Sequence, residues 1–190
     1  MNESAPPWEP PLAGSDAEQI LGSLERMRAT FRWKADGLDA AGLAHRIGVS
    51  DLSLGSLLKH LALVEDHYFT NLFAGGGYPA VWGELGHDGS DDWEFRTAGD
   101  DAPAVLYALY DEAVGRSREA MMAVLADGGM DQRFEMGDPD RQPSLRAVLC
   151  SLIEEYGRHV GHADLIRESV DGRVGEDPPA DWRAPFDADR

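Results

Sequence analysis

The sequence predicts an all-α protein that folds as a four-helix bundle, with a long connection between the second and third helices. Three observations support this fold class. Four segments of about 20 residues carry apolar side chains three or four positions apart, the spacing of one helix face. No segment gives a strong strand signal. Apolar residues make up 43% of the 190 residues, which is ordinary for a folded domain.

The first helix is expected over residues 15–37 and the second from about residue 53 to the glycine run at 75–77. Ser15 and Glu18 have the spacing of a capping box, which begins a helix, and Gly37 suits its end. The second helix has an apolar stripe, and its charged residues fall between the members of this stripe. The members of this stripe are Leu54, Leu57, Leu58, Leu61, Val64, Tyr68 and Leu72.

The third helix is expected to begin near Asp101, with Pro103 in its first turn, and to end at Gly128. The fourth runs from about Ser144 to Gly172. One stripe of the fourth helix is apolar in its first half and polar in its second. It consists of Leu145, Val148, Leu152, Glu155, His159, His162 and Ile166.

The chain is expected to divide into three parts. Residues 1–14 contain four prolines and predict a flexible arm, residues 15–172 form the bundle, and residues 173–190 form an acidic, proline-containing tail. The connection over residues 74–100 is long enough to be a crossover or to cover a site. Its aromatic residues Trp82, Trp93 and Phe95 are expected to cover the bundle, and its acidic residues are expected to face solvent.

Composition excludes several classes of function. The net charge of −18 opposes attraction to nucleic acid or to anionic lipid. No apolar run is long enough to span a membrane, and the N-terminus does not resemble a secretion signal, so a cytoplasmic location is expected. The single cysteine, Cys150, excludes an internal disulfide and a cysteine-rich zinc site, and its apolar neighbours predict that it is packed in the core.

Histidine spacing predicts a candidate metal site. His60 and His67 share one stripe of the second helix, and Glu155 and His159 lie one turn apart on the fourth. An imidazole from His60 would complete a group of two histidines and one carboxylate with open coordination positions. This donor set suits Zn, Ni, Fe or Mn without discriminating sharply among them. The alternative is that these histidines are hydrogen-bonded residues of the core or rim.

The remaining candidates carry weaker signals. His67 and His162 are candidates for a pocket base or for residues at the bundle rim, and no catalytic residue is assigned. His45 and His87 are expected to be structural or solvent-facing. The sequence lacks a Glu-x-x-His pair on two helices, which disfavours a ferritin-like di-iron centre.

Two segments carry a family resemblance. Residues 56–69 (SLLKHLALVEDHYF) and 154–164 (EEYGRHVGHAD) resemble the second-helix and fourth-helix motifs of the DinB superfamily of metal-binding four-helix bundles. The resemblance covers about residues 15–175 and implies that His60, Glu155 and His159 hold one divalent metal. Most relatives have histidine at the position of Glu155, whereas mycothiol-dependent maleylpyruvate isomerases have glutamate. Many relatives have glutamine where this chain has His162.

The resemblance also implies an activity. Characterised relatives are isomerases or S-transferases that use mycothiol, bacillithiol or glutathione, so a metal-bound thiol and a small electrophile are the expected co-substrates. Arg158 and Arg167 could donate to a polar cofactor, although arginines on a helix more often face solvent. The alternatives are a non-enzymatic, metal-binding or stress-associated dimer and a non-haem iron enzyme. A homodimer is expected in each case.

Overall fold

The computed structural model describes residues 6, 8–135, 140 and 142–187. Within these residues the chain is helical and has no strand, which confirms the all-α prediction. The α-helices are α1 (Asp16–Ala35), α2 (Ala40–Ala44), α3 (Leu54–Glu65), α4 (Ala80–Glu84), α5 (Trp93–Thr97), α6 (Pro103–Asp127) and α7 (Leu145–Asp171). A π-helix (Asp66–Phe73) continues α3, and short 3-10 turns lie at Ala98–Asp100, Gly129–Asp131 and Pro185–Asp187.

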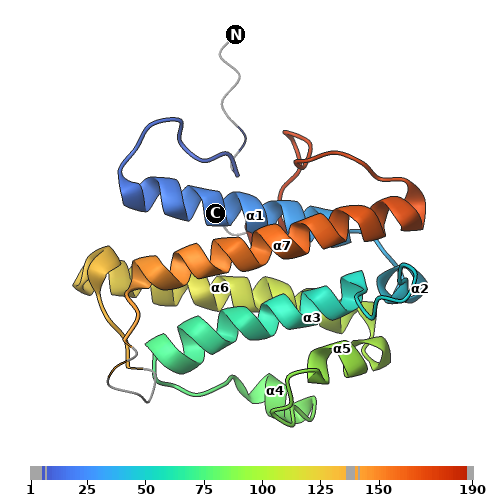
Figure 1. The fold of residues 1–190 in the computed structure, drawn as a ribbon, viewed down its shortest axis with the longest axis horizontal. Coiled ribbons are helices and arrows are strands. Elements are labelled where there is room, and N and C mark those ends of the chain that lie inside the picture. The colour runs from blue at the N-terminus through green and yellow to red at the C-terminus, as the bar shows by residue number, and fades with distance from the viewer. Residues whose placement is uncertain (1–5, 7, 136–139, 141, 188–190) are drawn as a thin grey trace.

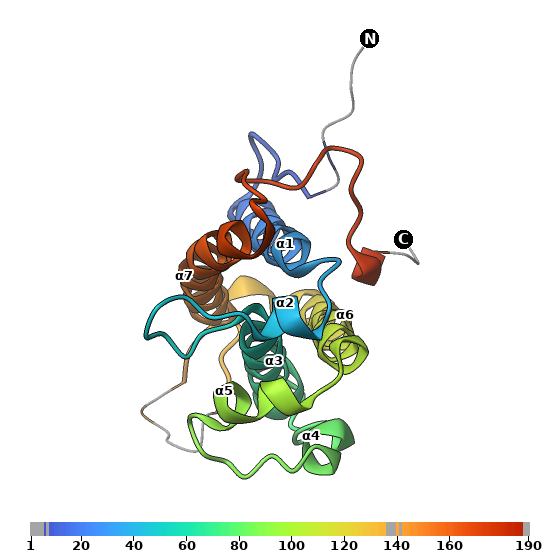
Figure 2. The same cartoon turned by 90° about the vertical axis from the view of Figure 1, so that its right-hand side faces the viewer.

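The four long helices lie side by side, as the side and end views show (Figures 1 and 2). Helices α1 and α7 run in one direction and α3 and α6 in the other (Figure 1). The most extensive contacts join α1 to α7 and α3 to α6, and α3 also contacts α7 and α1. Helix α3 is therefore adjacent and antiparallel to α7, which is the arrangement that the candidate site requires.

Local sequence signals explain where these helices begin and end. Ser15 accepts from the backbone N–H of Glu18 and Glu18 accepts from that of Ser15, which forms the expected capping box of α1. The hydroxyl of Ser144 accepts from the Ala147 N–H at the start of α7. Gly172 ends α7 in the left-handed conformation, with φ of 79°. The predicted bounds of these helices are confirmed to within one or two residues.

The second predicted helix changes its hydrogen bonding partway along. It is α-helical to Glu65 and becomes a π-helix from Asp66 to Phe73, so the apolar stripe continues over a wider turn. Asp66 at this junction is fully buried. A charged residue of this helix is therefore part of the core.

The connection between α3 and α6 returns along the outside of α3 and carries α4 and α5 (Figure 1). Trp82 and Trp93 are almost fully buried in the main core, which confirms that aromatic residues of this segment cover the bundle. Sequence periodicity missed α2, α4 and α5, because a five-residue helix is too short to show a repeat.

A buried polar cluster joins the long helices. Arg28 of α1 donates to both carboxylate oxygens of Glu65 of α3, at 2.7 and 2.6 Å. Tyr156 of α7 donates to Glu65 at 2.8 Å, and Tyr110 of α6 donates to the Arg28 carbonyl at 3.2 Å. All four residues are fully buried, so each helix has a specific polar contact within the apolar core.

The described parts of both terminal segments contact the helices. Trp8 is 9% exposed and Ala184 is 2% exposed. Arg118 of α6 donates to Asp187 at 2.9 Å, and Arg26 of α1 donates to Asp177 at 2.8 Å. The predicted boundaries at residues 14 and 172 lie next to the start of α1 and the end of α7. The division of the chain into three parts stays a prediction.

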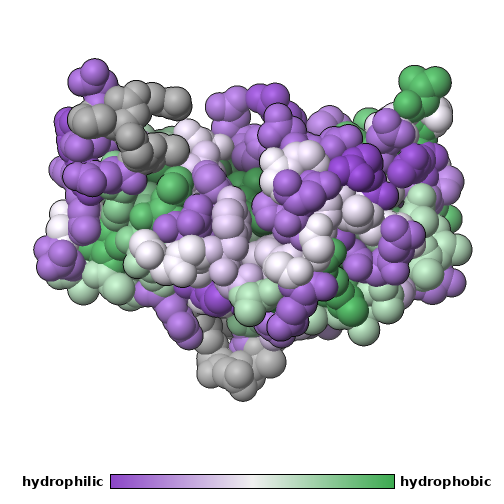
Figure 3. All heavy atoms as spheres, turned by 90° about the horizontal axis from the view of Figure 1, so that it is seen from below, coloured by the Kyte–Doolittle hydropathy of each residue, from purple (hydrophilic) through white to green (hydrophobic). Residues whose placement is uncertain are grey.

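No helix of the described part of the chain is long and apolar enough to cross a membrane. The face seen in Figure 3 carries separate apolar patches among polar residues.

Candidate metal centre

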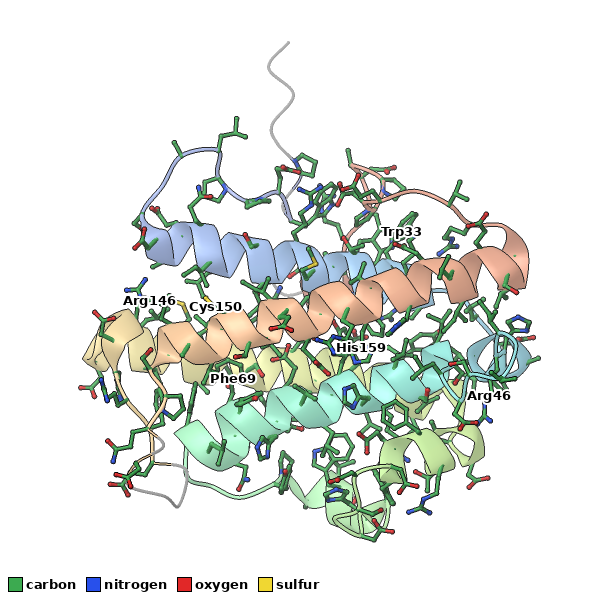
Figure 4. The ribbon with its side chains drawn as sticks, viewed as in Figure 1. Trp33, Arg46, Phe69, Arg146, Cys150 and His159 are labelled. Carbon is green, nitrogen blue, oxygen red and sulfur yellow. The ribbon has the colours of Figure 1, made fainter. Side chains whose placement is uncertain are left out.

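Three predicted site residues come together between α3 and α7. His60 lies in the middle of α3, and Glu155 and His159 lie one turn apart on α7. His159 is at the junction of these two helices (Figure 4). One atom from each residue can be chosen so that all three lie within 4.8 Å of one another. The helical spacing on α7 and the antiparallel neighbour α3 produce this convergence.

Glu155 is at the centre of the group. Its Oε1 is 3.0 Å from His60 Nε2 and 3.0 Å from His159 Nε2. The two imidazole rings have centroids 4.9 Å apart and are inclined by 67°. Both Nε2 atoms are thus directed at one carboxylate oxygen from different sides, as two ligands of a shared cation would be.

The opposite ring nitrogens have their own partners. His60 Nδ1 is 2.8 Å from Glu94 Oε1, and His159 Nδ1 is 3.3 Å from His162 Nδ1. Because Nδ1 of each histidine has a hydrogen-bond partner, Nε2 is the nitrogen that remains available to a metal. The hydrogen bond at one ring nitrogen determines whether the other donates, accepts or binds a metal. Sequence reasoning missed Glu94, which was expected in solvent and is 5% exposed. The aromatic neighbours Trp93 and Phe95 were the signal that this part of the acidic connection packs inward.

The electrostatics of the group favour a positive charge at its centre. Burial lowers the pKa of His60, but the hydrogen bonds to Glu94 and Glu155 outweigh it and raise this pKa overall. Burial alone would raise the pKa of Glu155, yet His60 and His159 lower it overall. Burial and the charge of His60 lower the pKa of His159. The two carboxylates thus favour a positive charge at His60, which a metal cation bound at Nε2 would also supply.

This donor set fits a divalent cation. Two neutral imidazoles and one carboxylate are ordinary ligands for Zn, Ni, Fe and Mn and leave coordination positions for another molecule. The hydrogen-bonded Nδ1 atoms match the way in which metal-binding histidines are usually held.

An open cavity of about 440 Å³ adjoins Glu155. Its volume lies in the range of small-molecule sites. It follows α3 and α7 away from the metal group and is lined by Leu63, Val64, His67, Tyr68, Tyr78, Ser151, Glu154 and Glu155. Tyr78 Oη is 2.6 Å from His67 Nδ1, and burial lowers the pKa of His67. His67 therefore lies in the cavity wall outside the metal group.

The other sequence candidates lie around this centre. His162 is half-buried, contacts His159 and lines a second cavity of about 210 Å³ together with Ile47 and Leu165. Arg158 is exposed and donates to Glu154 at 2.8 Å, and it does not line the larger cavity. Arg167 is buried and donates to the Lys34 and Asp36 carbonyls, which gives it a structural contact.

Three further expectations can be compared with the structure. Cys150 is exposed, so the prediction that it is packed in the core is wrong. It follows the buried Leu149 on a helix whose successive residues point in different directions. His45 contacts the hydroxyl of Ser169 at 2.9 Å, and His87 packs against Trp93, so both have structural contacts.

The fold and the site define an all-helical protein with a candidate two-histidine, one-carboxylate metal centre beside an open cavity. A family model described as mycothiol S-transferase matches residues 19–172. The chain belongs to this family, which is part of the DinB-like superfamily. Comparison with curated proteins and with solved structures gave no match.

Proposed function

We propose that this protein is a divalent-metal-dependent S-transferase or isomerase that uses a small thiol of the mycothiol type to act on a small electrophile. The observation that carries the proposal is the convergence of His60, Glu155 and His159 beside a cavity large enough for a co-substrate. Membership of the mycothiol S-transferase family supports the choice of thiol. We also propose that the four long helices form a DinB-type bundle.

The residues around the candidate centre would have separate roles in such a reaction. His60 and His159 would hold the metal through Nε2, and Glu155 through a carboxylate oxygen, while Glu94 and His162 hold the two imidazole rings. A bound divalent metal would supply a Lewis acid that favours the thiolate, which is the nucleophilic form of a thiol. The cavity wall, including His67 and Tyr78, would contact the rest of the co-substrate.

The thiol is proposed to come from outside the chain. The only cysteine, Cys150, is exposed and does not line the cavity next to Glu155. We further propose one metal ion per chain, with Zn or Ni first and Fe or Mn next. A homodimer in the cytoplasm, a flexible arm over residues 1–14 and a tail over residues 173–190 complete the proposal.

The test combines metal analysis with a conjugation assay. Wild-type protein should take up about one equivalent of Zn²⁺ or Ni²⁺ and should join mycothiol to a chromogenic electrophile only when loaded. His60→Ala and His159→Ala should lose both properties, whereas His45→Ala should keep both. Failure of the wild-type protein to bind either metal would contradict the proposal. Activity that needs Fe(II) and O₂ but no thiol would instead identify a non-haem iron enzyme.

A further inference from the structure

The long connection contributes a buried carboxylate to the metal group. Glu94 is 5% exposed, whereas Asp88, Asp91 and Asp92 in the same connection are exposed. Burying an ionised carboxylate is costly unless it is paired. The partner of Glu94 is His60 Nδ1, at 2.8 Å from Oε1.

We propose that Glu94 is a positioning residue for the metal: its carboxylate holds the Nδ1–H of His60 and thereby fixes Nε2 as the ligand atom. This inference rests on the proposed function, because it concerns the same metal. A carboxylate can only accept from His60, so Nδ1 must carry a hydrogen. Nε2 then remains as the ring nitrogen that faces Glu155, 3.0 Å away, and it is the atom at which a metal can replace a proton.

Contacts on either side of Glu94 hold it in place independently of His60 Nδ1. The ring of Phe95 lies 5.1 Å from the His60 ring at an interplanar angle of 32°. Lys59 Nζ lies 3.9 Å from the centroid of the Trp93 ring and donates to the Thr97 hydroxyl at 2.8 Å. Helix α5 therefore contacts α3 on both sides of Glu94, and these contacts hold the Glu94 carboxylate in a fixed position next to His60.

Charge balance gives a second reason for a carboxylate here. Glu94 and Glu155 both hydrogen-bond to His60, and together they carry two negative charges when ionised. A divalent cation held by neutral His60 and His159 would balance these charges. Replacing Glu94 by glutamine leaves one positive charge unbalanced in a partly buried site and weakens the binding of the cation.

The experiment measures the Zn²⁺ dissociation constant of the full chain by competition with a chromogenic chelator. Glu94→Gln should bind Zn²⁺ about 10–100-fold more weakly than wild type, in the range found for residues that hold metal-binding histidines. Glu84→Gln is the matched control, because Glu84 is an exposed glutamate of the same connection, and it should bind as wild type does. Glu94→Asp keeps the charge and should recover part of the loss.

The metal-free proteins are compared by circular dichroism and thermal unfolding, and their Co²⁺ absorption spectra are recorded. A positioning role predicts weaker binding and a changed Co²⁺ spectrum in a variant that is folded without metal. If Glu94→Gln is unfolded, Glu94→Asp replaces it in both measurements. Wild-type affinity in the folded variant would overturn the inference and leave the proposed function intact. Absence of Zn²⁺ binding by wild type would overturn both.

Discussion

Glu155 is the residue through which both histidines of the candidate centre are connected, since one of its oxygens lies 3.0 Å from each Nε2. Glu155→Gln should weaken Zn²⁺ binding at least about tenfold, because an amide oxygen lacks the negative charge that attracts the cation. Glu155→His should retain more affinity than Glu155→Gln, because neutral imidazole is a good ligand for the same metals.

Chelator competition on the metal-free proteins provides the measurement for Glu155. Glu154→Gln is the matched control, because Glu154 is the exposed neighbour that pairs with Arg158. Equal Zn²⁺ affinities of wild type and Glu155→Gln would show that the carboxylate is not a ligand.

Helical spacing predicted which residues of the site share a face, but not all of their partners. Glu155 and His159 lie on one face of α7, because their i, i+4 spacing corresponds to one helical turn. The contact between His60 and Glu94 depends on the path of a connection in which long-range packing decides the conformation. No periodicity encodes that path, so Glu94 was missed.

At the scale of elements, the π-helix that follows α3 begins at Asp66, a buried residue with partners in several segments. Its two carboxylate oxygens accept from Arg116 of α6 at 2.9 and 2.8 Å, from Trp82 of α4 at 2.8 Å and from Thr70 at 2.9 Å. Asp66 is thus the shared partner of three segments. A sequence stripe cannot reveal this role, because the partners lie up to 50 residues away.

Asp66→Ala should lower the free energy of unfolding by about 2–4 kcal/mol, because Arg116 and the indole N–H of Trp82 lose their common acceptor. Urea unfolding followed by circular dichroism measures this loss. Asp91→Ala removes the same charge at an exposed position, so it should leave the unfolding midpoint unaltered. An unchanged midpoint for Asp66→Ala would mean that the cluster does not stabilise the fold.

At the scale of the whole molecule, sequence patterns predicted the order and bounds of the four long helices because each one buries an apolar stripe. The patterns did not reveal how the charged residues pair. Arg28, Lys59 and Glu65 are almost fully buried in ion pairs that cross between helices or reach the connection. Such pairs join residues far apart in sequence, so they form only when the helices pack together. Once formed, they favour this packing of the helices.

Glu25 extends this pairing toward the C-terminal segment and makes it sensitive to acid. It accepts from Arg28 at 2.7 Å and from Arg118, which also donates to Asp187. Burial raises the pKa of Glu25, but the charges and hydrogen bonds of the two arginines outweigh it, so this pKa lies below its ordinary value of 4.5. The unfolded chain therefore binds more protons near this carboxyl than the folded chain does.

The contribution of Glu25 to stability is accordingly present above about pH 4.5 and is lost as the pH falls through its lowered pKa. At neutral pH, Glu25→Gln should be less stable than wild type by about 1–3 kcal/mol, because Arg28 and Arg118 lose a charged partner. Below the lowered pKa of Glu25 this difference should shrink, so the wild-type protein loses more stability on acidification. Urea unfolding at neutral and acidic pH, with the exposed Glu168→Gln as control, measures both differences. Parallel losses in wild type and Glu25→Gln would show that the acid sensitivity arises elsewhere in the protein.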